Sequence, residues 1–226
     1  MLSQRMAMSY LMVASDVRAD KGMRQLDDSM AQFEEQMLNI TEYLANKKQV
    51  AALKEVQQLW QQHRMHLLQP ANKDTMAKLL EENDALLAAC DKLVKHIAMV
   101  TNQPSALLVD IAGRQRMLSE RIAKLYLAKA WKVNMPGLDD KLSKAIELYD
   151  SSLRQLQNDP GNNAQIRDTL DKIASQWNFA KSGFPLGDKG QFVPTMIVVT
   201  TESMLSKNEQ LTELYAIRMQ QSLAVR

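Results

Sequence analysis

A short segment that occurs twice constrains the fold of this chain more than any other feature. Its fuller copy lies in residues 110–124 and contains MLSER from Met117 to Arg121, and a partial copy opens the chain at residues 1–7 with the sequence MLSQRMA. Self-similarity at a long spacing is the sequence signature of a repeated structural unit. The chain is therefore predicted to consist of two similar halves.

Apolar residues recur at helical spacing along most of the chain. One stripe in each half shows the pattern: Leu26, Met30, Phe33, Met37, Ile40 and Leu44 in the first, and Leu138, Leu142, Ala145, Leu148, Ser152 and Leu156 in the second. Only 7 Gly and 6 Pro occur among 226 residues, so helix formers dominate. We therefore expect an all-α fold of two tandem up-and-down four-helix repeats, packed as elongated helical bundles.

The expected domains are residues 1–103, a first repeat truncated at its N-terminus, and residues 104–226, a second repeat that carries the full motif. Pro104 and Ser105 mark the boundary, because Pro removes a helix donor and Ser can cap the helix that follows. Trp60 and Trp177 occupy matching places in the third expected helix of each half. These landmarks support the duplication independently of the motif.

Local signals predict where several helices begin and end. Gly22 marks the expected end of a first helix over residues 1 to 21. Asn162 with Gln165 resembles a capping box before Ile166. Residues 197–201 are β-branched, but we assign them to the last helix because the second half repeats the plan of the first.

The long side chain of Arg116 is the main candidate for binding chemistry. At about 100° per residue it shares a helix face with the small residues Ala112, Gly113 and Ala123, which would let another helix come close. A guanidinium in a close helix pair must be neutralised by a carboxylate or by a bound anion. Spacing alone favours an ion pair with Glu120, four residues further on. A flat oxyanion is the alternative, because its paired oxygens match the donor fork of arginine.

The segment from Gly113 to Arg121, GRQRMLSER, resembles the signature of the PilJ/NarX-like sensor domains, which include the N-terminal domain of type IV pili methyl-accepting chemotaxis transducers. These are extracytoplasmic nitrate and nitrite sensing modules of bacterial histidine kinases and chemoreceptors. The resemblance implies a four-helix bundle in which Arg116 meets the anion, with Gly113, Met117 and Arg121 completing the motif. Arg5 would be the counterpart of Arg121 in the first repeat.

The resemblance implies a non-catalytic sensing or binding module for nitrate or nitrite in bacterial signal transduction, located in the periplasm or otherwise outside the cytoplasm. Such domains are normally followed by a transmembrane helix and signalling domains, which this sequence lacks. We therefore expect a homodimer or a signalling partner protein to relay the signal. Because the first copy of the motif opens at Met1 without a secretory signal, we also expect the first repeat to continue upstream.

Other function classes find little support. The formal charge of +2 argues against a nucleic-acid groove, and no apolar run is long enough to span a membrane. We find no phosphate loop, nucleophile elbow or convincing pair of catalytic carboxylates, so we expect no enzyme activity and no cofactor. The remaining alternative is a structural or protein-interaction helical module without a small ligand.

Histidine and cysteine residues offer no metal or redox site. His63 and His66 have a spacing compatible with two metal ligands, but no third ligand is evident, so we expect no metal. The single Cys90 rules out an intramolecular disulfide and falls among Leu86, Leu87, Leu93 and Val94. We expect a buried structural thiol.

Overall fold

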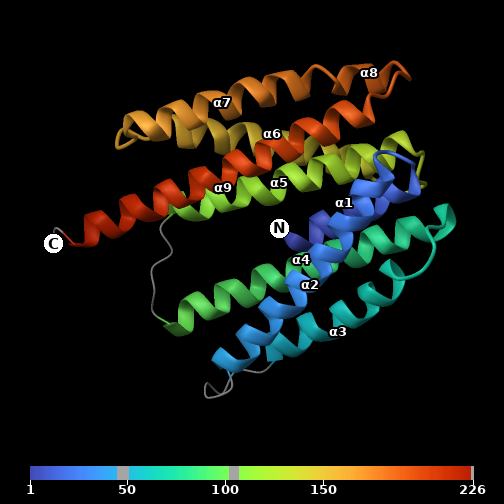
Figure 1. Cartoon of the computed structure of the whole chain (residues 1–226), viewed down its shortest axis with the longest axis horizontal. Coiled ribbons are helices and arrows are strands. Elements are labelled where there is room, and N and C mark those ends of the chain that lie inside the picture. Colours follow the sequence, from blue (N-terminus) through green and yellow to red (C-terminus); the bar gives the residue numbers. More distant parts are fainter. Residues whose placement is uncertain (45–50, 102–106, 225–226) are drawn as a thin grey trace. The chain divides into compact units, whose positions relative to one another are not determined.

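The computed structural model describes residues 1–44, 51–101 and 107–224, and all regular secondary structure in these ranges is helical (Figure 1). The all-α prediction is confirmed. The chain divides into two compact units. We call residues Leu2–Pro104 with Trp131–Pro136 the N-terminal unit, and Ser105–Ala130 and Gly137–Arg226 with Met1 the C-terminal unit. The predicted boundary at Pro104 and Ser105 lies outside the described residues.

In the N-terminal unit, four helices follow one another along the described residues: α1 (Leu2–Ala14), α2 (Ala19–Leu44), α3 (Ala51–Leu67) and α4 (Lys73–Thr101). Helix α1 packs against α2 and α4, and α3 packs against α4. The Phe33 and Trp60 rings join α2 to α3, with their centroids 4.7 Å apart. The apolar stripes of these helices therefore meet in one core, as their period predicts.

The prediction that the first helix ends at Gly22 is wrong. Helix α1 ends at Ala14, and the turn before α2 places Asp16 and Arg18 at positive φ. Gly22 lies inside α2, where a Cβ atom would stand 2.9 Å from Cβ of Met12 and 3.0 Å from the carbonyl oxygen of Ser9. Glycine is needed at this position because two helices nearly touch there, and not because it stops a helix.

In the C-terminal unit the described helices are α5 (Leu107–Ala130), α6 (Leu138–Gln157), α7 (Ala164–Lys181), the short α8 (Phe184–Asp188) and α9 (Pro194–Ala224). Helix α5 packs against α6 and α9, and α7 packs against α6 and α9. The assignment of the β-branched residues 197–201 to a helix is confirmed, because they lie within α9. Ile197 and Val198 are fully buried there. Pro194 opens α9 at a position where its missing N–H costs nothing.

The predicted capping box at Asn162 is also wrong. The N-cap of α7 is Asn163, whose side chain accepts a hydrogen bond from the Ile166 N–H at 2.9 Å. The Asn162 side chain is buried, donates to the Leu156 carbonyl and accepts from the Tyr215 hydroxyl. Asn162 therefore fastens the α6–α7 turn to α9, which no local pattern encodes.

Two aromatic contacts recur in both units. The Tyr149 and Trp177 centroids lie 4.4 Å apart at 41°, which matches the 44° of the pair between α2 and α3. The Tyr10 hydroxyl donates to the carbonyl oxygen of Gln69, just after α3. The Tyr126 hydroxyl donates to the carbonyl oxygen of Gly183, just after α7. The first and third helices of each unit are thus joined in the same way.

Candidate functional site

The motif lies on α5, and the apolar side of this helix forms part of the core. Ile111, Leu118, Ile122 and Leu125 are all buried. Gln115 lies on the same side, is fully buried, and donates to the Tyr149 carbonyl at 3.1 Å and to Ser152 Oγ at 3.0 Å. The α5–α6 packing therefore fixes the rotation of α5 about its axis, and with it the direction of Arg116.

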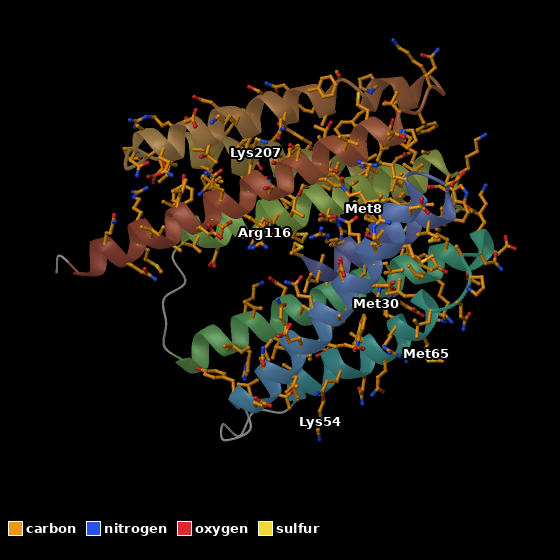
Figure 2. The ribbon with its side chains drawn as sticks, in the orientation of Figure 1. Met8, Met30, Lys54, Met65, Arg116 and Lys207 are labelled. Carbon is orange, nitrogen blue, oxygen red and sulfur yellow. The ribbon has the colours of Figure 1, made fainter. Side chains whose placement is uncertain are left out.

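Arg116, which is labelled in Figure 2, forms an ion pair with a residue of another helix. Its Nη2 donates to Oε1 of Glu209 on α9 at 2.7 Å. The pair is partly open to solvent, since 28% of the Arg116 side chain and 43% of the Glu209 side chain are exposed. The Arg116 Nε atom is enclosed and has no acceptor within the described residues. One donor of the guanidinium fork is thus used by a carboxylate, and another is not used.

This arrangement corrects two expectations. The partner of Arg116 is Glu209 rather than Glu120, so the ion pair joins two helices instead of one turn of α5. The close helix approach predicted around Arg116 fails at Gly113, where a Cβ atom would meet nothing within 4 Å. Ala112 and Ala123 are nevertheless fully buried. Gly113 is therefore not required by packing.

The remaining motif residues divide between the two units. Met117 and Arg121 lie half-buried on α5, in the C-terminal unit, and Arg114 on the same helix is exposed. Arg5 lies half-buried on α1, in the N-terminal unit. Within each unit by itself, the structure brings Arg116 to Glu209 and Arg5 to α2.

The contact of Arg5 is with an amide. When the Gln25 amide is oriented to satisfy its neighbours, its oxygen accepts from Arg5 Nε at 2.8 Å and Nη2 at 2.9 Å, and its nitrogen donates to Ser9 Oγ. Arg5 forms no ion pair within the described part of the chain. The guanidinium of Arg5 is thus held in place without being neutralised there.

The two histidines considered as metal ligands have other partners. His63 is buried, and its Nε2 lies 3.2 Å from Nδ2 of Asn83. His66 Nδ1 lies 2.6 Å from Oε2 of Glu82. Across residues 1–44, 51–101 and 107–224, no group of three or more potential ligands is placed to hold a metal ion.

The prediction of a buried thiol holds only in part. Cys90 lies partly exposed on α4, where Leu86 and Leu93 are buried but Val94 is 62% exposed. Burial nevertheless raises the pKa of the thiol from 9.0 to about 11. At neutral pH the group is a protonated, weakly nucleophilic thiol.

The residue of the candidate site that sequence reasoning missed is Glu209. It is far from Arg116 along the chain, and the helical pattern of α9 marks it only as a polar position beside the buried Asn208. Nothing in the sequence pairs these two positions. The contact follows from how α9 packs along α5, which is a tertiary property.

Comparison with known proteins supports the resemblance for part of the chain. Residues 97–185 match the PilJ family model, described as the N-terminal domain of type IV pili methyl-accepting chemotaxis transducers. The match covers less than half of the chain but contains all of α5, α6 and α7. No match was found among curated proteins or among solved structures. No helix in the part of the chain that the structure describes is both long and apolar enough to cross a membrane.

Proposed function

We propose that this chain is a non-catalytic sensing module that binds a small oxyanion, nitrate or nitrite first, at Arg116. The observation that carries the proposal is the partly exposed Arg116 guanidinium on the family-matched helix α5, whose acceptor among the described residues is the Glu209 carboxylate. Nitrate presents a flat pair of oxygens like those of a carboxylate, so it can accept the same donors. Gly113, Met117 and Arg121 lie on the same helix as Arg116 and complete the proposed site. Arg5 is the proposed counterpart of Arg121 in the first repeat.

We propose further that the anion competes with Glu209. In the structure the Arg116 guanidinium links α5 to α9 through Glu209. A bound anion would satisfy Arg116 and release the Glu209 carboxylate to solvent, which it already reaches in part. Occupancy would then change the link between two helices of one bundle. A ligand shifts such an equilibrium only by its differential affinity for the two arrangements, and here the difference is the ion pair itself.

The experiment is calorimetric titration of the full chain with sodium nitrate, with sodium chloride as the reference salt. We expect Arg116→Ala to abolish the nitrate heat. Arg114→Ala should leave it unchanged, because Arg114 is an exposed arginine on the same helix. Glu209→Gln should strengthen binding by about twofold to fivefold, since exposed ion pairs contribute little and only that competition is removed.

Matched controls separate competition from a general change in charge. Glu213→Gln removes a carboxylate one turn further along α9, where it is exposed. Glu213→Gln should not change the nitrate affinity by the factor expected for Glu209→Gln. Nitrate heat that survives Arg116→Ala would refute the site, and equal effects of the two glutamine variants would refute the competition.

The ion pair also favours a second candidate function. Arg116 and Glu209 could serve only to hold α5 against α9 in a structural or protein-interaction module without a small ligand. The titration decides between the two, because such a module gives no nitrate heat with the intact chain. Removing either partner would then change only the stability of the C-terminal unit.

The proposed setting follows the matched family. We propose a role in bacterial signal transduction, a location in the periplasm or otherwise outside the cytoplasm, and relay of the signal through a homodimer or a signalling partner protein. The support is the family description, which names a chemotaxis transducer. Protease accessibility of the chain in intact cells, compared with cells whose outer membrane has been opened, tests the location.

We also propose that residues 1–103 and 104–226 are tandem copies of one helical repeat. The supporting observations are the matched ring pairs between the second and third helices of each unit, and the matched Tyr10 and Tyr126 hydroxyl contacts. Each of these contacts joins residues that are far apart in the sequence. In both units a Trp of the third helix packs on an aromatic ring of the second, and a Tyr of the first helix donates to a carbonyl just after the third.

A further inference from the structure

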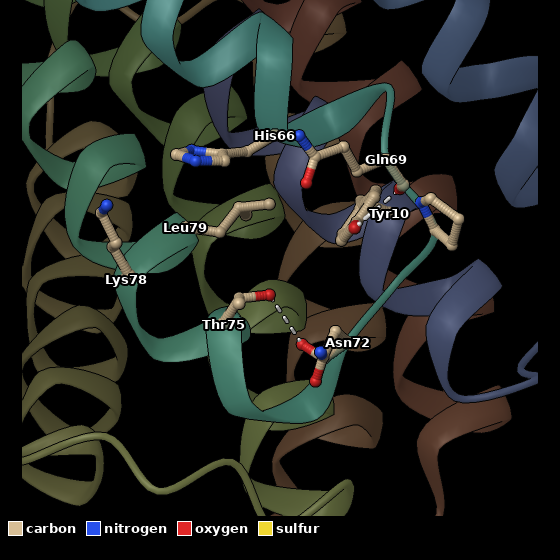
Figure 3. A pocket seen from close by; sticks show the side chains of 8 residues that line it. Tyr10, His66, Gln69, Asn72, Thr75, Lys78 and Leu79 are labelled. Atoms are coloured by element: carbon tan, nitrogen blue, oxygen red, sulfur yellow. Dashed lines mark hydrogen bonds between the residues drawn. The ribbon is translucent and has the colours of Figure 1, made fainter.

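The N-terminal unit contains a cavity of about 340 Å³ where the turn between α3 and α4 lies over α1 (Figure 3). Its lining includes Tyr10, His66, Gln69, Pro70, Lys78 and Leu79. A volume in this range is large enough for a small organic molecule. All of these residues belong to one unit, so the cavity is complete within it.

The floor of the cavity is apolar and fixed. Tyr10 and Leu79 are 5% and 4% exposed, so their positions are set by the core. The Tyr10 hydroxyl donates to the Gln69 carbonyl at 3.0 Å, which anchors the turn to α1. Pro70 stiffens the same turn. A flat or short hydrocarbon body placed here would meet a preformed surface.

The rim of the cavity carries donors and no carboxylate. Lys78 forms no ion pair, and the Gln69 side-chain amide has no hydrogen-bond partner, among the residues that the structure describes. His66 directs Nδ1 at Glu82, 2.6 Å away, which fixes the ring and leaves Nε2 unused. Figure 3 shows the His66 ring and the Lys78 amine toward one side of the cavity, with Tyr10 toward the other. The cavity thus offers an apolar floor and a cationic side.

We propose that this cavity binds a small monocarboxylate with a flat apolar body. The carboxylate accepts from the Lys78 ammonium, and the apolar body covers the Tyr10 ring and Leu79 beside the fixed His66 ring. A cationic ligand is disfavoured because it would meet Lys78 without any lining carboxylate. A neutral ligand of the same shape keeps the floor contacts but leaves the Lys78 charge unused. The site is separate from Arg116 and does not depend on nitrate binding.

The test is a heteronuclear NMR titration of the full chain with sodium benzoate, and with benzamide as the neutral molecule of the same shape, at constant ionic strength. We expect saturable shifts of backbone amides around residues 66–79 with benzoate, and binding of benzamide weaker by about fivefold. Lys78→Gln should weaken benzoate by a similar factor. Because Lys78 is exposed, this replacement leaves the core intact.

Two control variants make the outcome decisive. Lys54→Gln removes an exposed lysine of α3, labelled in Figure 2, that does not line the cavity, and it should leave benzoate binding unchanged. Arg116→Ala should also leave it unchanged, which keeps this site distinct from the anion site. Equal affinities for benzoate and benzamide, equal losses in the Lys78 and Lys54 variants, or no saturable shift at all would overturn the proposal.

Discussion

The indole Nε1 of Trp177 on α7 donates to Oδ1 of Asp150 on α6 at 2.6 Å, while its ring packs against Tyr149, the residue before Asp150. Lys181 on the next turn of α7 reaches the same carboxylate at 3.1 Å. The Trp177 side chain thus packs in the aromatic core and also binds the partly buried pair of Asp150 and Lys181. Trp60 occupies the corresponding place in the N-terminal unit, packed on Phe33.

We expect Trp177→Ala to lower the free energy of unfolding of the C-terminal unit by about 3–5 kcal/mol. The Trp177 side chain is 1% exposed, so its removal leaves a large cavity and takes the hydrogen-bond donor from Asp150. Phe179→Ala, two residues further along α7 at a position 57% exposed, should change stability by less than about 0.5 kcal/mol. Urea unfolding followed by circular dichroism measures both. Similar losses would show that Trp177 is not a core residue.

A second prediction concerns the start of α7. Asn163→Ala should cost about 1 kcal/mol, because the side-chain oxygen that accepts from the Ile166 N–H is lost. Asn158→Ala provides the control, since Asn158 is exposed and contributes only its backbone N–H to the end of α6. Thermal unfolding of the two variants should show a lower midpoint for the first and an unchanged midpoint for the second. A lower midpoint for Asn158→Ala than for Asn163→Ala would contradict the assignment of Asn163 as the N-cap of α7.

The helical architecture could be predicted from the sequence because it depends on local periodicity. The stripes on α2 and α6 predicted most of the buried residues of these helices, although Leu148 in the α6 stripe is 44% exposed. Even the β-branched segment of α9 was correctly assigned, because its place in the order of helices outweighed its propensity. Such signals lie within a few residues of the feature that they describe.

The errors concern contacts between distant segments. Gly22 has the identity expected of a helix stop, but the constraint on it is the approach of Met12 on another helix. Asn162 has the identity of a cap, but its side chain serves Tyr215 on α9. Arg116 was correctly singled out as needing a partner, yet Glu209 could not be chosen from among the many polar positions of α9. A single sequence contains no direct record of such pairs.

The thiol of Cys90 should react slowly. Burial raises its pKa from 9.0 to about 11, so at pH 8 the thiolate fraction is smaller than that of an unperturbed thiol by about a hundredfold. The rate of reaction with a disulfide reagent, compared with the urea-unfolded chain, measures the difference. Because the unfolded chain loses this proton first, stability should fall as pH rises from 9 toward 11. A native-state rate equal to that of the unfolded chain would contradict the burial.

Two Gly→Ala substitutions should have opposite signs. Alanine normally stabilises a helix interior by about 0.5–1 kcal/mol relative to glycine. At Gly113 the new methyl group meets nothing within 4 Å, so Gly113→Ala should show this gain. At Gly22 the methyl group would stand 2.9 Å from Cβ of Met12 and 3.0 Å from the Ser9 carbonyl oxygen, neither of which can turn away without moving α1. Gly22→Ala should therefore lower the unfolding free energy by about 1–3 kcal/mol despite the better propensity. Urea unfolding compares the two variants, and a gain at both positions would mean that α1 and α2 do not pack as closely as the glycine implies.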